Sequence, residues 1–290
     1  MTKTGLKISK KLLDVLINKM KLQTFDTRPT VLPIKKIVME NENTNTYIFE
    51  HTLNSRPGQF IMMWIPGVDE KPFSIALDDK NELWITVCRV GPATEELFKL
   101  KEGDKVGIRG PFGTAYEIEA DDHLALVAGG YGAAPMYFAA YEAIKKGAKV
   151  EFLVGARNES LLLFTQKILG LGGAGLHIST DDGSKGYKGF VTELLDQVMI
   201  EEKSINKVFT CGPEIMMKFV GEIAVKNGAE CFMSVEKYMK CGLGVCGQCA
   251  IDDTGVLACK SGPVMNYKYV KSLSEFGKYH RDAQGKKHYF

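Results

Sequence analysis

The stretch that decides the fold is LVAGGYGAAPM, residues 126–136. It starts with an apolar run, passes through Gly129, Gly130 and Gly132, and leads into a helical pattern over residues 133–145. A strand, a glycine-rich turn and a helix in this order are typical of a parallel sheet that binds a pyrophosphate at the amino end of the helix. The spacing is not GxGxxG, so a tight connection that binds no ligand is the alternative.

The same rhythm continues along the chain from residue 122. Apolar runs of strand length alternate with helical patterns, at 124–128, 150–154, 176–179 and 207–210. This alternation predicts a parallel sheet covered by helices. FTCGP places Cys211, Gly212 and Pro213 directly after the last run, at the sheet edge where such folds bind ligands. In TDDGSKGYKG, Asp181 and Asp182 either bind ribose hydroxyls or are solvated turn residues.

Residues before 122 follow a different pattern. Short apolar runs are separated by glycine and proline turns, at 37–39, 46–49, 60–65, 83–87 and 105–108. This spacing predicts a small antiparallel β-barrel, so the expected fold class is a β-barrel plus an α/β domain. The predicted divisions are an N-terminal extension (1–30), the barrel (31–121), the α/β domain (122–228), a small cysteine-rich domain (229–268) and a C-terminal tail (269–290).

The cysteine-rich domain contains CGLGVCGQC followed by LAC. Cys241, Cys246, Cys249 and Cys259 have the spacing C-x4-C-x2-C-x9-C. The first three match plant-type [2Fe–2S] sites, in which four thiolates hold two iron atoms. Glycines between them allow the loop to wrap a cluster and to direct backbone N–H groups at its sulfurs. A structural zinc site is the alternative, but such sites usually use two paired knuckles, and only one C-x2-C pair is evident.

Composition excludes several classes of function. The 290 residues carry a formal net charge of +2 without a clustered basic stripe, which argues against nucleic-acid binding. No apolar run approaches the roughly 20 residues of a membrane helix. Seven cysteines, an odd number, fit a reducing cytoplasm better than a disulfide framework. Near the N-terminus, apolar residues at helical spacing favour a short amphipathic helix over a signal peptide: Ile8, Leu12, Leu16 and Met20.

KPFSIA, residues 71–76, lies ahead of the glycine-rich turn and resembles the RxYS flavin motif of the ferredoxin–NADP reductase-like family. The resemblance implies that the chain binds FAD through Lys71, Pro72, Phe73 and Ser74. In that family the basic residue contacts a flavin phosphate, the aromatic residue packs on the flavin ring and the hydroxyl approaches N5. This chain has Lys71 where the family motif has arginine, and a lysine cannot bind phosphate in a bidentate way. It has Phe73 where the motif has tyrosine, so one hydroxyl is missing.

VCRVGPAT, residues 87–94, resembles the next flavin-binding element of the same family. Arg89 would supply a positively charged guanidinium, whose parallel N–H groups can bind phosphate in the bidentate way that the ammonium of Lys71 cannot. The resemblance also places Cys211 beside the nicotinamide, so that Ser74 and Cys211 are the expected catalytic residues of hydride transfer. The flavin contacts that this element implies are Val87, Cys88, Arg89, Ala93 and Thr94, with Ala93 at a position where the family has glycine.

The order of barrel, nucleotide-binding domain and cysteine cluster indicates a narrower family within this group. Residues 31–265 resemble the electron-transfer subunits of NAD-dependent dihydroorotate dehydrogenases, iron–sulfur flavoproteins of pyrimidine biosynthesis. That implies FAD, a [2Fe–2S] cluster and NAD(H), in a cytoplasmic heterotetramer of two plus two with an FMN-containing TIM-barrel catalytic subunit. Electrons would pass from that FMN through the cluster and FAD to NAD. Exposed apolar residues would contact the partner: Met239, Leu243 and Val245.

Other proteins combine the same parts with a different partner. One alternative is the small flavin and iron–sulfur subunit of an NADH-dependent ferredoxin:NADP oxidoreductase, or of a cytosolic hydrogenase or sulfur reductase. A second alternative, from a different class, is a binding module in which the cysteines hold zinc and the sheet binds another nucleotide. The sequence does not decide between NADH and NADPH.

Overall fold

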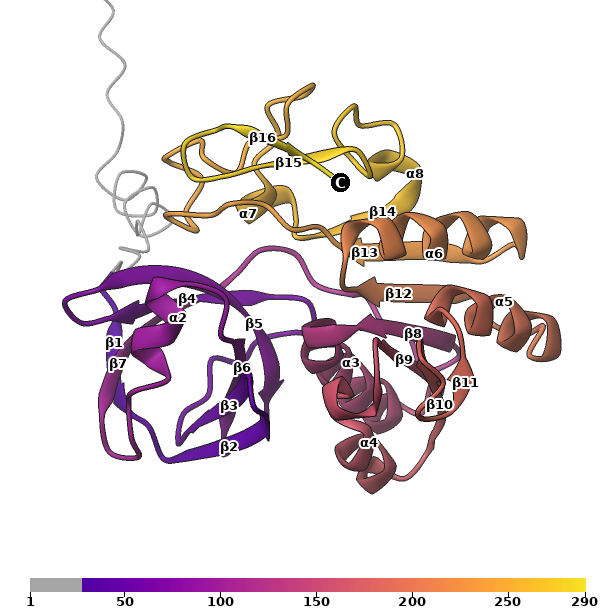
Figure 1. Cartoon of the computed structure of the whole chain (residues 1–290), viewed down its shortest axis with the longest axis horizontal. Coiled ribbons are helices and arrows are strands. Elements are labelled where there is room, and N and C mark those ends of the chain that lie inside the picture. Colours follow the sequence, from indigo (N-terminus) through magenta and orange to yellow (C-terminus); the bar gives the residue numbers. More distant parts are fainter. Residues whose placement is uncertain (1–27) are drawn as a thin grey trace, which may run out of the picture.

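A computed structural model describes residues 28–290 of the chain. The helix predicted near the N-terminus lies outside the described residues. Figure 1 shows a curled antiparallel sheet in purple, a parallel sheet with helices on both faces, and orange and yellow C-terminal segments beside them. The predicted fold class, a barrel-like antiparallel domain joined to an α/β domain, is confirmed.

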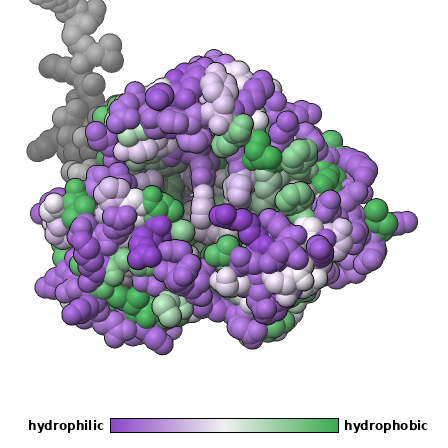
Figure 2. Space-filling view, in the orientation of Figure 1, coloured by the Kyte–Doolittle hydropathy of each residue, from purple (hydrophilic) through white to green (hydrophobic). Residues whose placement is uncertain are grey.

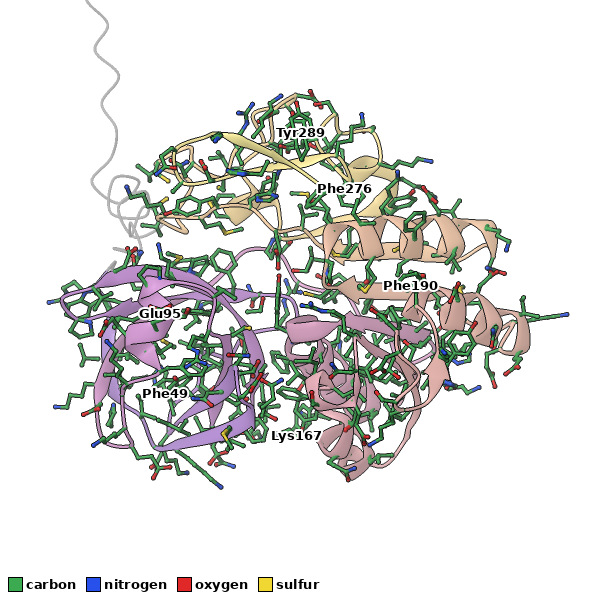
Figure 3. All side chains as sticks on the ribbon, viewed as in Figure 1. Phe49, Glu95, Lys167, Phe190, Phe276 and Tyr289 are labelled. Atoms are coloured by element: carbon green, nitrogen blue, oxygen red, sulfur yellow. The ribbon has the colours of Figure 1, made fainter. Side chains whose placement is uncertain are left out.

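The first region is a seven-stranded antiparallel sheet in the order β1-β7-β4-β5-β6-β3-β2. It curls around an apolar core that includes Phe49, which is labelled in Figure 3. A short helix that the sequence pattern does not predict, α2 (Pro92–Leu97), packs against β4 and β5. The strands are β1 (Thr30–Pro33), β2 (Lys36–Asn41), β3 (Thr44–Phe49), β4 (Phe60–Ile65), β5 (Asp69–Asp78), β6 (Leu83–Cys88) and β7 (Lys105–Phe112).

Strand β5 is also absent from the runs that the sequence pattern predicts, although it contains residues 71–76. Its first half is polar, and proline is rare in a central strand because it has no N–H to donate. Pro72 nevertheless lies opposite Met62 of β4, and the pairing with β6 shifts register between Ile75 and Leu77. The residues that resemble a flavin motif therefore lie on a central strand of the sheet.

The second region is a sheet in the order β11-β10-β9-β8-β12-β13-β14, parallel except for its last strand. Its strands are β8 (His123–Gly129), β9 (Lys149–Ala156), β10 (Ala174–Thr180), β11 (Tyr187–Lys188), β12 (Lys207–Cys211), β13 (Glu230–Ser234) and β14 (Val264–Asn266). The helices are η1 (Gly130–Gly132), α3 (Ala133–Lys146), η2 (Glu159–Leu161), α4 (Thr165–Leu171), α5 (Val191–Glu201) and α6 (Glu214–Lys226). Strand β13 thus continues the sheet beyond residue 228.

Both faces of this sheet are buried, which explains the continuous apolar run of β8. Leu124 and Leu126 belong to the core that includes α3 and α4. Ala125 and Val127 point to the other face and belong to a second core with α5 and α6. Alternate residues of one strand therefore serve two separate apolar layers.

The C-terminal segments share the second of these cores. Met239 and Ile251 are buried with Val220 of α6, so this region has no separate core of its own. Phe276, labelled in Figure 3, packs into the same core. The elements here are α7 (Ala258–Ser261), α8 (Tyr267–Val270), β15 (Tyr279–Arg281) and β16 (Lys287–Tyr289).

Polar contacts join the regions. Lys167 of α4, labelled in Figure 3, pairs at 2.7 Å with Glu40 of β2, whose carboxylate is almost fully buried. The hydroxyl of Tyr116 donates to the carbonyl of Thr210 over 2.9 Å. The face drawn in Figure 2 is mainly hydrophilic, with apolar residues in scattered groups. Within residues 28–290, every helix is too short or too polar to cross a membrane.

Candidate cofactor-binding site

Two loops predicted to bind a nucleotide meet at the carboxyl edge of the parallel sheet. A Cβ atom added at Gly132 would overlap the carbonyl oxygen of Cys211. One added at Gly129 would lie 2.8 Å from Cδ of Pro213, and one at Gly212 would lie 2.9 Å from the nitrogen of Gly129. Glycine is therefore needed here for the two loops to pack backbone against backbone.

Gly130 differs from its neighbours because nothing lies beside it. Its φ is +52°, and an added Cβ would meet no atom within 4 Å. The backbone of the turn is thus open on this side, just before the first turn of α3. An open backbone ahead of a helix amino end is the arrangement that accommodates a pyrophosphate.

Tyr131, Cys211 and Glu236 lie close to one another next to these loops. The hydroxyl of Tyr131 donates to the carboxylate of Glu236, and the thiol of Cys88, at the end of β6, contributes to the raised pKa of the same hydroxyl. Burial, followed by the charge of Glu236, raises the pKa of the Cys211 thiol to about 12, so the thiol is uncharged at neutral pH. Side chains from the barrel and from the parallel sheet therefore meet here.

Sequence reasoning did not assign a role to Tyr131 or Glu236. Both are exposed, yet desolvation by surrounding atoms is the main reason that their pKa values are raised. Tyr131 lies inside the glycine-rich turn, and that was the one signal in the sequence that could have identified it.

The strand with the flavin-like motif faces the cysteine-rich region. The ammonium of Lys71 lies 2.6 Å from Oδ2 of Asp69 and 5.5 Å from the ring centre of Tyr238. Ser74 lies opposite Phe60, is half-buried, and has no hydrogen-bond partner for its hydroxyl among residues 28–290. Phe73 and Pro72 are half-buried. The hydroxyl of Ser74 is therefore available to a ligand, whereas the ammonium of Lys71 already has an anionic partner.

The second flavin-like element is engaged in local contacts. Arg89 donates from Nη2 to Oδ1 of Asn43 over 2.9 Å, and its guanidinium lies over the ring of Phe98. Thr94 accepts hydrogen bonds from the backbone N–H groups of Val90 and Gly91, which organises the start of α2. Val87 and Ala93 are buried, so neither side chain is exposed to a ligand.

Asp182 lies in the loop after β10, at the same edge of the sheet but two strands away from β8. Its carboxylate accepts hydrogen bonds from the N–H and the hydroxyl of Ser184, and these lower its pKa. Asp181 is exposed. The geometry is that of a local turn, and Asp182 remains exposed at the ligand edge.

The four clustered cysteines interact mainly as two pairs. Cys241 interacts with Cys246, and Cys249 interacts with Cys259, which also feels the charge of Cys241. Among residues 28–290, no three of these sulfurs lie within 4.8 Å of one another. A single zinc ion would hold all four sulfurs within about 4 Å, because Zn–S bonds are about 2.3 Å. Sulfurs spread in this way fit two iron atoms better than one zinc ion.

Backbone N–H groups are directed at the sulfurs, as a thiolate-bound cluster requires. The N–H of Leu243 lies 3.4 Å from Sγ of Cys241. Desolvation opposes ionisation of the Cys241 thiol, but N–H groups of Cys246, Leu243 and Val245 outweigh it and lower its pKa to about 6. The loop achieves this with Gly242, Gly244 and Gly247, all at positive φ.

The cluster loop rests directly on the barrel. A Cβ at Gly242 would lie 3.0 Å from Met62 of β4 and 3.0 Å from Phe112 of β7. Arg109 of β7 donates to the carbonyl of Cys241 over 3.1 Å and forms an ion pair with Glu70. Strand β4 is the neighbour of β5, so one strand separates the cluster loop from the flavin-like motif.

The residues expected to face a partner are only partly exposed. Val245 is 81% exposed, and Cys246 beside it is exposed as well. Leu243 is half-buried. Met239, in contrast, is 6% exposed and packs into the second core, so its predicted position on the contact surface is wrong. The cysteine-rich region is too small to be stable alone, and Met239 is one of the residues that attach it to α6.

Together, a curled antiparallel sheet, a parallel sheet with a glycine-rich edge, and two cysteine pairs define an iron–sulfur protein with a ferredoxin-reductase-like fold. A solved structure titled as an NADH-dependent reduced ferredoxin–NADP oxidoreductase has a TM-score of 0.74 and 29% identity, covering 82% of this chain and 88% of that chain. The FAD/NAD-binding domain of a nitric oxide dioxygenase from Vibrio cholerae shares the fold, with a TM-score of 0.61 and 20% identity, over 70% of this chain and 94% of its own.

Sequence comparisons narrow this class to one family. Residues 236–271 match the iron–sulfur cluster binding domain of dihydroorotate dehydrogenase B, and residues 126–222 match an oxidoreductase NAD-binding domain. A probable dihydroorotate dehydrogenase B (NAD(+)) electron transfer subunit from Methanocaldococcus jannaschii is 47% identical over 263 residues, covering 91% of this chain and 99% of that protein. Its counterpart in Methanothermobacter thermautotrophicus is 43% identical, covering 89% and 97%. The chain belongs to the family of dihydroorotate dehydrogenase B electron transfer subunits, as the resemblance predicted.

Proposed function

We propose that this chain is the oxidoreductase subunit that carries electrons from dihydroorotate, oxidised on a partner subunit, to NAD. Its cofactors are FAD, a [2Fe–2S] cluster and NAD(H). When bound, the flavin exchanges electron pairs with a nicotinamide and single electrons with an iron–sulfur cluster. The observation that carries the proposal is the placement of Gly242 so close to Met62 that an added Cβ would lie 3.0 Å from it, one strand away from the flavin-like motif.

The proposed roles of the chain's residues follow from their positions. Ser74 would donate its free hydroxyl near flavin N5, and Cys211 would pack, as an uncharged thiol, beside the nicotinamide. The open backbone at Gly130 would receive the pyrophosphate of NAD. The remaining flavin and nucleotide contacts would come from Lys71, Pro72, Phe73, Val87, Cys88, Arg89, Ala93, Thr94, Gly129, Gly132, Asp182, Gly212 and Pro213.

We propose that three consecutive segments of the chain each bind one cofactor. Residues 31–121 would bind FAD, 122–228 would bind NAD, and 229–268 would hold the cluster. Strand β13 lies in the NAD-binding sheet and leads directly to Glu236, so it ties the cluster region to the nucleotide site.

The proposed partner is an FMN-containing TIM-barrel subunit, in a cytoplasmic heterotetramer of two plus two. The support within this chain is the exposure of Val245 and Cys246, which places one edge of the cluster loop at the surface. An exposed apolar side chain beside a redox centre is suited to contact with another subunit.

A second candidate is the flavin and iron–sulfur subunit of an NADH-dependent ferredoxin:NADP oxidoreductase. The TM-score of 0.74 to a structure of that name favours it. The 47% identity to a dihydroorotate dehydrogenase B subunit, over nearly the whole of both chains, favours the first proposal. Copurification decides between them, because the two functions require different second polypeptides.

The test of the proposed function is Cys246→Ser in the complex with its partner. Removal of an exposed cluster ligand should abolish electron transfer from dihydroorotate to NAD and leave reduction of FAD by NADH largely intact. Stopped-flow absorbance on the purified complex measures both steps. Cys231→Ala, a buried cysteine outside the cluster, is the control and should retain both activities.

Two results would contradict the proposed function. One is loss of FAD reduction by NADH in Cys246→Ser while the flavin is still bound. That result would mean that electrons from NADH pass through the cluster before they reach the flavin. The other is a wild-type protein that is colourless and contains zinc without acid-labile sulfide. Flavin bands with a broad iron–sulfur shoulder in the visible spectrum are the expected result.

A further inference from the structure

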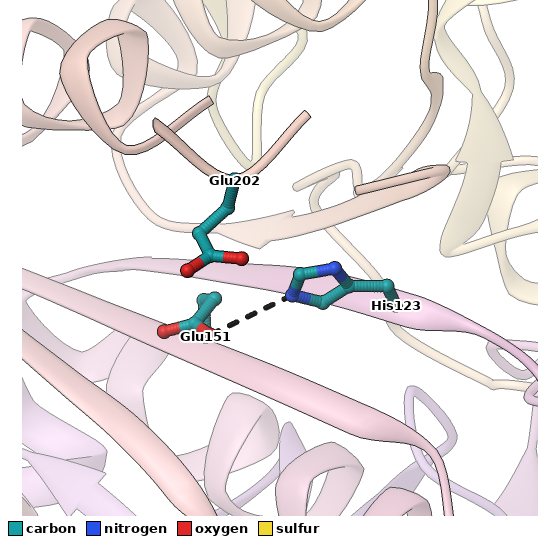
Figure 4. A group of neighbouring side chains, drawn as sticks. All are labelled: His123, Glu151 and Glu202. Atoms are coloured by element: carbon teal, nitrogen blue, oxygen red, sulfur yellow. Dashed lines mark ion pairs between the residues drawn. The ribbon is translucent and has the colours of Figure 1, made fainter. Parts of the chain in front are cut away.

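A group of ionisable side chains lies at the amino edge of the parallel sheet, at the opposite end from the cofactor loops. His123 begins β8, Glu151 lies near the start of β9, and Glu202 follows the last residue of α5. One ligand atom from each lies within 4.8 Å of the other two. Figure 4 shows the imidazole of His123 directed at Glu151, with the carboxylate of Glu202 above them.

His123 is the unusual member of this group. Its side chain is 7% exposed, and its Nδ1 lies 2.7 Å from the hydroxyl of Ser204. Its Nε2 is buried and has no hydrogen-bond partner among residues 28–290; Oε1 of Glu151, at 3.6 Å, is too far. A buried polar nitrogen without a partner destabilises a protein by about 1–3 kcal/mol, so something is expected to bind it.

Glu151 is held in place from its other side. Its Oε2 lies 2.8 Å from Nε2 of His177, and its side chain is 10% exposed. A Cβ at Gly175 would overlap Oε2 of Glu151, although the φ of Gly175 is not in the left-handed region. Glycine at this position of β10 therefore serves to make room for the carboxylate.

The charges around the group favour a cation. Two carboxylates face one lysine, since Lys149 lies 2.7 Å from Glu202 and 3.8 Å from Glu151. The ammonium of Lys149 is on a side chain that is 55% exposed, so it can turn toward solvent.

We propose that His123, Glu151 and Glu202 bind one divalent transition-metal ion of the zinc type. One nitrogen and two carboxylate oxygens, with water in the fourth position, form a ligand set that zinc accepts at about 2.0–2.2 Å. Ser204 would accept the Nδ1 proton of His123, and His177 would orient Glu151. Partners of this kind fix the ligands of known metal sites. The ion would join β8, β9 and the end of α5, away from the path of electrons.

The test is titration of the full-length holoprotein with Zn²⁺, followed by isothermal calorimetry and metal analysis. The expected result is one Zn²⁺ per chain with no loss of iron. The unfolding temperature should also rise by several degrees at about 100 times Kd. Glu202→Gln should weaken Zn²⁺ binding about tenfold or more, as expected for the loss of one charged ligand. Glu201→Gln, at the exposed neighbouring position, is the matched control and should bind like wild type.

His123→Gln provides a second variant, because it removes the buried nitrogen and keeps a polar side chain of similar size. It should also lose the Zn²⁺ affinity, while its NADH-dependent flavin reduction stays unchanged. The proposal is overturned if the holoprotein takes up no stoichiometric Zn²⁺, if Glu202→Gln binds it as tightly as wild type, or if Zn²⁺ uptake releases iron. None of these results bears on the electron-transfer function, whose test is independent.

Discussion

The two edges of the parallel sheet are built in opposite ways. At the carboxyl edge, the loops at residues 129–132 and 211–213 touch through their backbones, because glycines leave no side chains between them. At the amino edge, charged side chains occupy the space. Asp122, for example, is 3% exposed and pairs with Lys207 at 2.8 Å.

This difference separates nucleotide binding from stability. An edge without side chains leaves backbone N–H groups available to a ligand, whereas most charged groups at the amino edge pair with one another, with Nε2 of His123 as the exception. Substitutions at the carboxyl edge should therefore change the affinity for nucleotide. Substitutions at the amino edge should change the free energy of unfolding and leave NADH binding intact.

The largest effect is expected at the amino edge. Asp122→Asn leaves the mostly buried ammonium of Lys207 without its charged partner, and we expect a loss of about 3 kcal/mol in the free energy of unfolding at pH 7. Urea denaturation of the purified protein measures it. Asp196→Asn, which removes the partner of the exposed Lys226, is the matched control and should lose less than about 1 kcal/mol.

The contribution of Asp122 should also depend on pH. Burial is the largest influence on this carboxyl and opposes its ionisation, but the hydrogen bonds from Lys207, the backbone of Glu119 and Asn206, with the charge of Lys207, together outweigh it and lower its pKa. The folded-state pKa is then below the unfolded value of about 4, so the stabilisation is complete above pH 5 and is lost as the pH falls through the folded-state pKa. The difference between wild type and Asp122→Asn should shrink in acid. A difference that stays constant down to pH 3 would contradict this assignment.

A smaller loss of stability is expected from Gly132→Ala at the carboxyl edge. The new methyl group would overlap the backbone of Cys211 and force the two loops apart, at a cost of about 2 kcal/mol in the free energy of unfolding. Gly170→Ala is the matched control, since an added Cβ there meets nothing within 4 Å. It lies inside α4 and should stabilise the protein by about 0.5–1 kcal/mol. Equal effects of the two substitutions would show that the loops do not pack as described.

The smallest expected effect is on the affinity for NADH, in addition to the strain that a β-branched residue has at the positive φ of Gly130. Gly130→Val should weaken NADH binding about tenfold, or about 1.4 kcal/mol, because a side chain would occupy the space proposed for the pyrophosphate. FAD content should not change. Gly147→Val is the matched control, because Gly147 also has positive φ and open surroundings but lies at the C-cap of α3, on the amino side of the sheet. Unchanged NADH affinity in Gly130→Val, measured by fluorescence titration, would exclude this turn from the nucleotide site.

Local signals in the sequence were sufficient for much of the architecture. The apolar run of β8 and the glycines after it predicted the turn into α3, since both strand and turn depend on neighbouring residues. The spacing of the four cysteines predicted a metal centre, because a loop that wraps a cluster must bring its ligands together within a few residues.

Other features depended on contacts that are distant in the sequence. The sequence pattern predicted no strand at residues 69–78, yet pairing with β4 and β6 on both sides places β5 in the middle of the barrel. Met239 was expected on a contact surface, but the small cysteine-rich region has no core of its own and buries this side chain against α6. Tyr131 and Glu236 meet across more than one hundred residues. No local pattern encodes such a contact.

The sequence by itself determined where the clustered cysteines lie, where the glycine-rich turn occurs and which family the chain resembles, because each is a property of short spacings. Only the tertiary structure decided that the cluster loop rests on the barrel at Gly242 and that Nε2 of His123 is buried beside two carboxylates, with no hydrogen-bond partner among residues 28–290. The physical reason is that burial and pairing of charges depend on which strands become neighbours. Which strands become neighbours depends on the packing of the whole sheet, and no single segment of the sequence determines it.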